Sequence, residues 1–417
     1  MATKKAATVK TDATPRQQPA TRKAPKTPPD SRGRRSPDTR SSSWSFRRIA
    51  GERTPMRPDC RLENSEPLAQ HLSRRVIGQE DAIEALVCSW SRVLSGLRDP
   101  RRPLLTGMLL GPTGVGKTET ALALAEALFG SASALHRINC EEYAHGHEVA
   151  KLLGSPPGYV GGDIEPLLSQ QRVDLPHWQL RQAGGQHGDQ QPALIERAHD
   201  ASGGLHSIIL FDEVEKAHPT LWNALLGILE EGRVTLGNNK TTDLTRAIIL
   251  MTSNVGSREM SQAMERVPIG FRAVEPTDKG EHVLRGIASE AARRVFPIEF
   301  LNRFDEVLVY RPLRSDHLGR IFDMFLADIN QRALEQAGVP LLIKTSPGAR
   351  AFVIGAGTDP TLGARPLRRA MERLIVDPVS RLLASDQVVG GDVVEAELEN
   401  GTLSFYRWPR SADSIVA

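Results

Sequence analysis

The architecture of this chain follows from eight residues, Gly111-Pro112-Thr113-Gly114-Val115-Gly116-Lys117-Thr118. They match G-x-x-x-x-G-K-[S/T], a pattern whose glycines let backbone N–H groups surround phosphate oxygens at the start of a helix. The apolar residues 104–110 before it predict a strand, and residues 119–128 after it predict a helix. This order of strand, glycine loop and helix predicts a bound nucleoside triphosphate, with Lys117 at its β- and γ-phosphates and the Thr118 hydroxyl on Mg²⁺.

Composition narrows the class of protein. The chain has 417 residues, of which 40% are hydrophobic and 25% charged, so two or three globular domains are expected. No apolar run approaches the roughly 20 residues that span a bilayer, so no membrane function is expected. The cysteines Cys60, Cys88 and Cys140 are scattered and predict neither a disulfide framework nor a cysteine zinc site. A reducing, cytoplasmic location fits this pattern.

The positive charge is concentrated at the beginning of the chain. Residues 1–60 carry 15 Lys and Arg against 5 Asp and Glu, which gives +10; the whole chain carries +3, so the remainder carries −7. Residues 1–62 are rich in Pro, Ser and Thr and hold too few large apolar side chains for a core, so a disordered basic tail is predicted. The tail could contact nucleic acid or serve as a solvated leader.

Five short apolar segments alternate with helical patterns. Such an alternation predicts an α/β fold with a five-stranded parallel sheet and flanking helices. Residues 171–205 are irregular and polar, and they are interpreted as a surface insertion. The expected strands are residues 104–110, 135–139, 207–211, 246–252 and 306–310.

The pattern changes after residue 312 and predicts a second, smaller α+β domain. Helices are expected at residues 316–336, 349–354 and 364–385. A hairpin is expected from residues 393–398 and 402–406, which turn at Glu399-Asn400-Gly401. The predicted organisation is therefore a tail at 1–62, a large domain at 63–312, a small domain at 313–408 and a short tail at 409–417.

Two acidic residues and one amide follow expected strands. Asp212 and Glu213 end the apolar run Ser207–Phe211, where Asp212 can hold the Mg²⁺ shell and Glu213 can polarise a water for attack on the γ-phosphate. An ordinary helix cap is the alternative interpretation. Asn254 ends the next strand and can orient the attacking water, although a turn residue would look the same.

With these elements in order, the chain resembles the AAA+ ATPases, specifically the Clp-type unfoldases, over about residues 68–408. The likeness is to the second ATPase module of ClpB and ClpA. It rests on long phrases in the family's order, which are Val76-Ile77-Gly78-Gln79, Gly111 to Thr118, Gly154-Ser155-Pro156-Pro157-Gly158-Tyr159-Val160-Gly161, Phe211-Asp212-Glu213-Val214-Glu215-Lys216-Ala217-His218-Pro219, Met251-Thr252-Ser253-Asn254, Glu299-Phe300-Leu301-Asn302-Arg303-Phe304-Asp305 and Gly363-Ala364-Arg365-Pro366-Leu367.

The resemblance implies roles for residues outside the phosphate loop. Val76 and Ile77 would flank the adenine of ATP, and Asn254 would be the first sensor of the γ-phosphate. Arg303 would be the arginine finger that completes a neighbouring subunit's site, and Arg365 would be the second sensor, reaching from the small domain. Either arginine could instead be a surface ion-pair residue. The implied cofactors are ATP and Mg²⁺, and the implied assembly is a ring, expected to be a hexamer.

The resemblance also implies a polypeptide substrate. Gly158-Tyr159-Val160-Gly161 matches the family's pore loop, in which Tyr159 and Val160 would grip a threaded chain; an exposed loop aromatic is the alternative. The leading hypothesis is an ATP-dependent protein unfoldase. A second is a regulatory subunit of a ClpP-like peptidase, docking through Ile269-Gly270-Phe271, which could equally be an apolar anchor. A third is a nucleic-acid motor or loader that uses the basic tail, and the Tyr-Val pore phrase argues against it.

The chain departs from the family in its organisation. Within its 417 residues we recognise one ATPase module, and neither a separate N-terminal substrate domain nor a coiled-coil middle domain. Substrates, adaptors and pathway are therefore left open by the sequence.

Overall fold

The computed structural model describes residues 66–155, 165–175, 204–265, 278–336, 341–359 and 362–408. All of them belong to one compact unit, Asp59–Ala417. The predicted tails, most of the predicted insertion, the pore-loop residues Tyr159 and Val160, and Ile269-Gly270-Phe271 lie outside the described residues. The predictions made for these segments therefore stay predictions.

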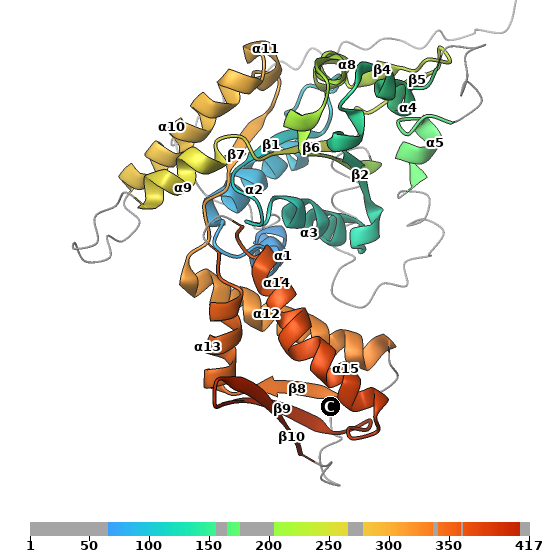
Figure 1. Ribbon diagram of the computed structural model, residues 1–417. Helices are drawn as coiled ribbons and strands as arrows, with labels where there is room; N and C mark the ends of the chain where they lie inside the picture. The colour runs from blue at the N-terminus through green and yellow to red at the C-terminus, as the bar shows by residue number, and fades with distance from the viewer. Residues whose placement is uncertain are drawn as a thin grey trace, which may run out of the picture. The chain divides into compact units, whose positions relative to one another are not determined.

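A five-stranded parallel sheet forms the centre of the larger part (Figure 1). Its strand order is β2-β3-β6-β1-β7, and every pair of neighbours runs parallel. All five strands expected from the sequence are present, which confirms the predicted fold class. Their bounds are β1 Leu105–Leu110, β2 Leu135–Asn139, β3 Ser207–Asp212, β6 Ala247–Ser253 and β7 Glu306–Val309.

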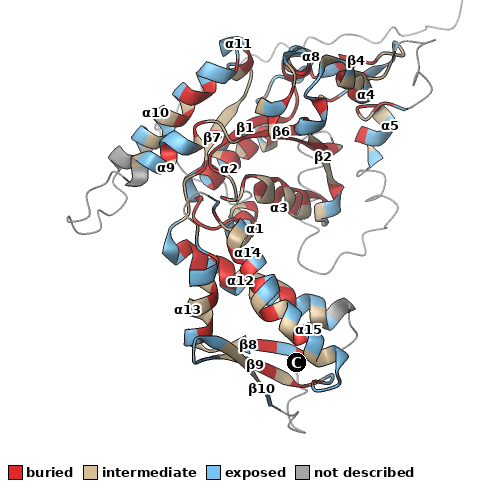
Figure 2. Cartoon of the chain, in the orientation of Figure 1, coloured by how far each residue is buried: buried red, intermediate tan, exposed pale blue. Residues whose placement is uncertain are grey.

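The apolar composition of the strands follows from burial on both faces of the sheet. Ile208 and Leu210 belong to a core with helices α1, α2 and α3, whereas Ile209 and Phe211 point to the other face, toward α8, α9, α10 and α11. Figure 2 shows these inner surfaces as buried. The helices are α1 Glu66–Arg75, α2 Glu80–Leu94, α3 Lys117–Phe129, α8 Pro219–Glu231, α9 Ser257–Glu265, α10 Asp278–Val295 and α11 Ile298–Leu301.

Short elements fill the connections between these layers. A hairpin of β4 and β5 turns through Asn239, a non-glycine residue with a positive φ of 60°. This hairpin was not predicted, because three-residue strands give almost no alternation to detect. The short elements are β4 Arg233–Thr235, β5 Thr241–Asp243, α4 Val149–Leu153, α5 Gln170–Val173, and the 3₁₀ turns Ala132–Ala134, Cys140–Tyr143, Gly146–Glu148 and Val214–Lys216.

The smaller C-terminal part has its own three-stranded sheet, in the order β10-β9-β8. The predicted hairpin is present, with Asn400 and Gly401 at positive φ in its turn. Strand β8 was not predicted; it pairs in parallel with β9. The elements are α12 Ser315–Gln336, β8 Leu342–Thr345, α13 Pro347–Ala356, α14 Arg365–Met371, a π-helical turn Glu372–Val376, α15 Asp377–Ala384, β9 Val393–Glu399 and β10 Thr402–Trp408.

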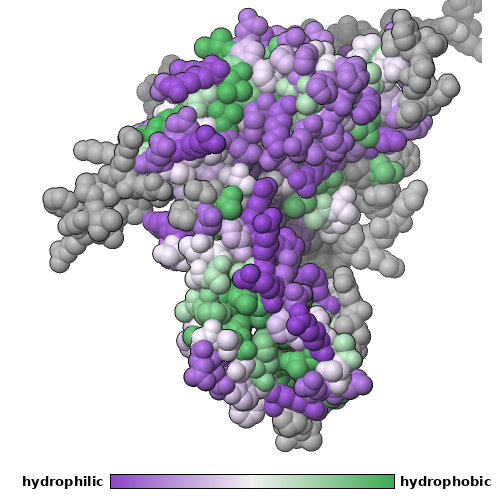
Figure 3. Space-filling view, in the orientation of Figure 1, coloured by the Kyte–Doolittle hydropathy of each residue, from purple (hydrophilic) through white to green (hydrophobic). Residues whose placement is uncertain are grey.

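The surface view shows polar side chains over most of the visible face, with apolar ones gathered over the smaller part and in another group at the upper left of the larger part (Figure 3). Leu342, Tyr406 and Trp408 of its sheet are 43%, 42% and 58% exposed. Within the described ranges, no helix is both long enough and apolar enough to pass through a membrane.

Candidate nucleotide site

The sheet order brings three separate sequence motifs together. Strands β3, β6 and β1 are neighbours, and because they are parallel their carboxyl ends lie at one edge of the sheet. The phosphate loop follows β1, Asp212 ends β3, and Asn254 follows β6. In open α/β sheets this edge is where ligands bind. The topology therefore accounts for residues that are more than 100 positions apart facing one cavity.

The phosphate loop takes a backbone path that needs glycine. Gly116, the residue before α3, has a φ of 110°, and Gly114 has a φ of 73°. A Cβ on Gly114 would lie 2.3 Å from the carbonyl oxygen of Leu362 in the smaller part. The loop leads directly into α3, whose free N–H groups and helix dipole favour an anion at this end. The loop thus has the geometry of a phosphate cradle.

Lys117 is a buried cation whose ammonium is hydrogen-bonded to neutral oxygens. Its side chain is folded back so that Nζ donates to the carbonyl oxygens of Gly111 at 2.5 Å and Pro112 at 2.7 Å and to Oδ1 of Asn254 at 2.8 Å, all neutral oxygens. The residue is 7% exposed, and burial lowers the pKa of the ammonium to about 8, against the opposing attraction of Glu215 and Asp212. A phosphate would place a negative charge in direct contact with this ammonium.

Asp212 and Thr118 form the oxygen pair expected to face a metal ion. The Thr118 hydroxyl lies 3.3 Å from Oδ1 of Asp212, and Asp212 is buried. The buried Thr252 hydroxyl donates to Oδ1 of Asp212 and accepts the backbone N–H of Glu213 at 2.9 Å. Mg²⁺ prefers such oxygen ligands and usually takes one or two from the protein and the rest from phosphates and water.

No group of three or more His, Cys, Asp or Glu side chains among the described residues could by itself hold a metal ion. The donor set at Thr118 and Asp212 nevertheless fits a magnesium ion that arrives with a triphosphate, because the phosphate oxygens would complete the shell.

Arg137 was not predicted by sequence and contacts the same carboxylate. Its Nε lies 3.0 Å and its terminal nitrogen 2.5 Å from Oδ2 of Asp212, and β2 and β3 set this pair because Asn139 is in register with Asp212. The signal that could have identified it is a lone arginine inside a strand that neighbours the acidic strand end.

Glu213 is held in a left-handed backbone conformation, with φ 58° and ψ 51°. Its Oε1 accepts from Nδ2 of Asn254 at 3.1 Å, and Lys216 Nζ lies 2.6 Å from its Oε2. Partial burial raises the pKa of this carboxyl, but the hydrogen bonds from Lys216 and Asn254 outweigh burial and lower it overall. Glu213 is therefore an ionised carboxylate at neutral pH, and Asn254 links it to Lys117.

These residues line one cavity of about 330 Å³. Val76 packs with the core beneath the sheet and Ile77 with the core of the smaller part, so this dipeptide joins the two. The smaller part closes the other wall, and Ala364 N–H donates to the Gly114 carbonyl at 3.0 Å. The lining residues are Arg75, Val76, Ile77, Thr113, Gly114, Val115, Gly116, Lys117, Thr118, Glu119, Leu122, Arg137, Asp212, Glu213, Thr252, Asn254, Leu313, Ile321, Met324, Phe325, Ala364, Arg365 and Arg368.

Arg303 is the predicted site residue that does not reach this cavity. Its guanidinium pairs with Glu230 of α8 at 3.1 Å, and its Nε is buried without a hydrogen-bond partner. Its carbonyl oxygen lies 3.4 Å from the Thr106 hydroxyl, near the beginning of β1. The structure thus brings together every other predicted site residue that it describes and leaves Arg303 apart.

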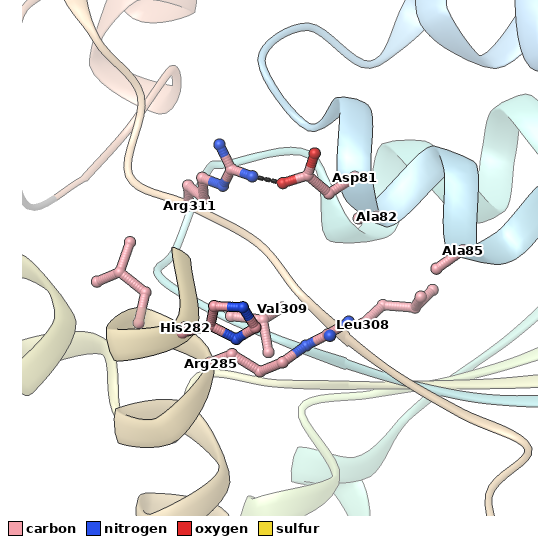
Figure 4. Close-up of a pocket in the computed structure, with 9 residues that line it drawn as sticks. Asp81, Ala82, Ala85, His282, Arg285, Leu308, Val309 and Arg311 are labelled. Atoms are coloured by element: carbon pink, nitrogen blue, oxygen red, sulfur yellow. Dashed lines mark ion pairs between the residues drawn. The ribbon is translucent and has the colours of Figure 1, made fainter. Parts of the chain in front are cut away.

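A second, smaller cavity of about 100 Å³ lies where α2, α10 and the end of β7 meet (Figure 4). Asp81 pairs there with Arg311, and His282 and Arg285 of α10 line the opposite wall. The cavity is too small for a nucleotide, which needs several hundred Å³. The cavity of about 330 Å³, which is lined by the phosphate loop, Asp212 and Asn254, is the candidate nucleotide site.

Fold and site together define a P-loop nucleoside triphosphatase whose nucleotide cavity is shared between an α/β sheet and a small C-terminal domain. Comparison with protein families agrees. Residues 102–176 and 180–307 match the family described as "AAA domain (Cdc48 subfamily)". Residues 313–396 match the "C-terminal, D2-small domain, of ClpB protein". The chain therefore belongs to the AAA ATPases of the Clp type.

Similar curated proteins carry names from this group. The chain is 36% identical over 338 residues to "Chaperone protein ClpB 1" of Synechococcus elongatus, covering 81% of the chain and 34% of that protein. It is 36% identical over 330 residues to "Negative regulator of genetic competence ClpC/MecB" of Bacillus subtilis, covering 79% of the chain and 36% of that protein. It is 35% identical over 334 residues to "Heat shock protein 100" of Trypanosoma brucei brucei, covering 80% of the chain and 34% of that protein. The chain thus spans about a third of the length of these relatives.

Proposed function

We propose that this chain is a Mg²⁺-dependent ATPase that works in a ring, expected to be a hexamer, to unfold or remodel polypeptides. The observation that carries the proposal is the hydrogen-bonded chain Lys117–Asn254–Glu213 across the floor of the cavity. It connects the residue placed to bind the γ-phosphate to the residue placed to activate water. Binding and cleavage of a triphosphate need these two functions next to each other.

The chain's own residues account for most of the proposed chemistry. The backbone of Gly111–Thr118 and the Lys117 ammonium bind the phosphates, and Val76 and Ile77 form the wall on the adenine side. Glu213, ionised and held by Asn254, accepts a proton from the attacking water. A Mg²⁺ ion at Thr118 and Asp212, when bound, would neutralise charge on the β- and γ-phosphates. Arg365, on the wall of the smaller part, supplies a cation facing Lys117.

The position of Arg303 supports assembly into a ring. Arg303 lies away from the cavity of its own chain, and its Nε is a buried donor without an acceptor. A guanidinium beside the transferring phosphoryl group typically raises the rate by about 10³–10⁵. We propose that Arg303 supplies this cation to the cavity of a neighbouring copy.

The polypeptide substrate is proposed from the sequence, since Tyr159 and Val160 lie outside the described residues. The names of the relatives, which include chaperones and a heat shock protein, support this choice. Docking of a ClpP-like peptidase through Ile269-Gly270-Phe271 and a cytoplasmic location stay predictions. Nothing described favours the nucleic-acid motor.

The proposal is tested by measuring phosphate release and the unfolding of a tagged fluorescent protein by the full chain. Glu213→Gln should bind ATP but hydrolyse it roughly 10²–10⁴ times more slowly, because the general base is lost. Tyr159→Ala should keep hydrolysis and lose unfolding. Tyr406→Ala, which removes an exposed aromatic of β10, is the matched control and should keep both. Normal hydrolysis by Glu213→Gln would show that the mechanism is misassigned.

A further inference from the structure

Arg137 is a charged residue of the nucleotide cavity to which the proposed mechanism gives no role. It lies on β2, lines the cavity, and points its guanidinium at the acid that is placed to serve the metal ion. Both its Nε and a terminal nitrogen contact the same oxygen, Oδ2 of Asp212. Hydrogen bonds between charged groups are stronger than those between neutral ones, so this contact holds the orientation of the Asp212 carboxylate.

The environment of the pair makes it more than a surface ion pair. The Asp212 side chain is 8% exposed, and its other oxygen accepts from Thr252, so the carboxylate has little solvent to compensate its charge. The Arg137 side chain is 56% exposed and faces the cavity. A buried carboxylate with a cation that can still move is suited to exchanging one positive partner for another.

We propose that Arg137 is a positioning residue for Asp212: it holds the charge of this carboxylate and thereby sets how strongly nucleotide binding depends on Mg²⁺. The proposal rests on the proposed function, because it concerns the same cavity. Arg137 acts on this dependence in two ways, and both make nucleotide binding depend less on Mg²⁺. The guanidinium competes with a metal ion for Asp212, which weakens binding in the presence of Mg²⁺. Without a metal ion it offsets the negative charge of Asp212, so that this carboxylate repels the metal-free nucleotide less.

The measurement is the ratio of two dissociation constants for a fluorescent ADP analogue, N-methylanthraniloyl-ADP, on the full chain. One is measured with excess EDTA and the other with saturating MgCl₂, and no hydrolysis is involved. Arg137→Gln should raise the ratio of the EDTA value to the Mg²⁺ value by roughly three- to tenfold, the range that the net contribution of one typical hydrogen bond gives. Arg137→Lys keeps the charge but not the paired donors, and should give a smaller rise.

Arg368→Gln is the matched control. Arg368 also lines the cavity, but it comes from α14 and contacts Glu372 at 3.7 Å, not Asp212. Its removal should weaken nucleotide binding with and without Mg²⁺ to the same degree. Both dissociation constants should therefore rise, and their ratio should stay unchanged. In an Asp212→Asn background, Arg137→Gln should no longer change the ratio, because the carboxylate on which it acts is gone.

The outcomes separate this inference from the proposed function. A ratio in Arg137→Gln that stays within about twofold of the wild-type value, or that falls, would overturn the role of Arg137. An equal rise in Arg368→Gln would also overturn it, because the effect would then belong to the charge of the whole cavity. Failure of the wild-type chain to bind the analogue with or without Mg²⁺ would instead count against the nucleotide site. Thermal unfolding checks each variant, and Arg137→Lys carries the test if Arg137→Gln does not fold.

Discussion

The two ends of strand β1 differ in how many of the predicted site residues they bring together. At its carboxyl end the phosphate loop, Asp212 and Asn254 are joined by hydrogen bonds around Lys117. At its amino end the backbone of Arg303 lies near Thr106, and its guanidinium pairs with Glu230. Thr106 and Gly111 are five residues apart, which is about 16 Å along a strand. An arginine anchored at one end cannot serve phosphates at the other end of the same sheet.

The candidate nucleotide residues therefore meet at one end of β1, whereas Arg303, which we propose acts in the cavity of a neighbouring copy, lies at the other end. The strand is buried over its whole length, so the separation does not change with side-chain motion. A second copy of the chain is the simplest way to bring Arg303 to the phosphates of a nucleotide cavity. Changing each end separately tests whether both ends of β1 belong to one reaction.

The largest effect is expected from Arg303→Ala. The variant should bind nucleotide as the wild type does, because Arg303 does not line the cavity, yet hydrolysis should fall by roughly 10³-fold or more, since the phosphoryl charge loses its cation. Hydrolysis and nucleotide affinity are measured on the same preparation at several protein concentrations.

Mixing two inactive variants sharpens this prediction. Lys117→Ala loses its own nucleotide site but keeps Arg303, so a mixture of Lys117→Ala with Arg303→Ala should recover part of the activity if the arginine acts between copies. A mixture that remains as inactive as its components would speak against a shared site. A loss of nucleotide affinity in Arg303→Ala alone would show that the two ends are coupled within one chain.

An intermediate effect is expected from Gly363→Ala, which acts at the carboxyl end. Gly363 has a φ of 60°, and an added Cβ would lie 2.6 Å from the Gly114 carbonyl, so the smaller part would have to move away from the phosphate loop. The hydrogen bond from Ala364 to Gly114 would be lost with it. Nucleotide affinity should fall by roughly tenfold, corresponding to about 1.4 kcal/mol.

Gly401→Ala is the control for backbone strain. Gly401 has a φ of 79° in the β9–β10 turn, and no atom lies within 4 Å of the position of its Cβ. This variant should lose about 1 kcal/mol of folding stability, as Gly363→Ala also should, but should keep its nucleotide affinity. Equal affinities in the two variants would mean that contact with the smaller part contributes nothing to binding.

The sequence predicted one end of β1 much better than the other. The phosphate loop, the acidic residues after β3 and Asn254 each follow a buried apolar strand. Because the carboxyl ends of parallel strands lie at one edge of the sheet, the order of these motifs along the chain was enough to predict that they lie close together. The five strands were predicted for the same reason. Strand β8 was missed, because Leu342-Ile343-Lys344-Thr345 is short and only Ile343 is deeply buried.

Contacts that depend on register between strands could not be predicted. Arg137 reaches Asp212 only because β2 and β3 align Asn139 with Asp212, and a shift of one residue would turn its side chain to the other face. Thr252 bridges Asp212 and Glu213 for a similar reason, since β6 lies beside β3. The partner of Arg303, Glu230, comes from the end of α8, more than 70 residues away, where no local pattern indicates it.

The smallest effect is expected from Glu230→Gln, which tests the amino end directly. The Arg303 and Glu230 side chains are 41% and 52% exposed, so their ion pair contributes at most about 1 kcal/mol. If Arg303 must leave Glu230 to reach a neighbouring copy, removing the charge of Glu230 should lower the protein concentration for half-maximal hydrolysis by roughly two- to fivefold. Glu231→Gln, one residue further along α8, is the matched control, because no ion pair joins Glu231 to Arg303. A Glu230→Gln variant that needs more protein, not less, would mean that Glu230 positions Arg303 for the neighbour, and the pair would then belong to the assembled site and not to the separate chain.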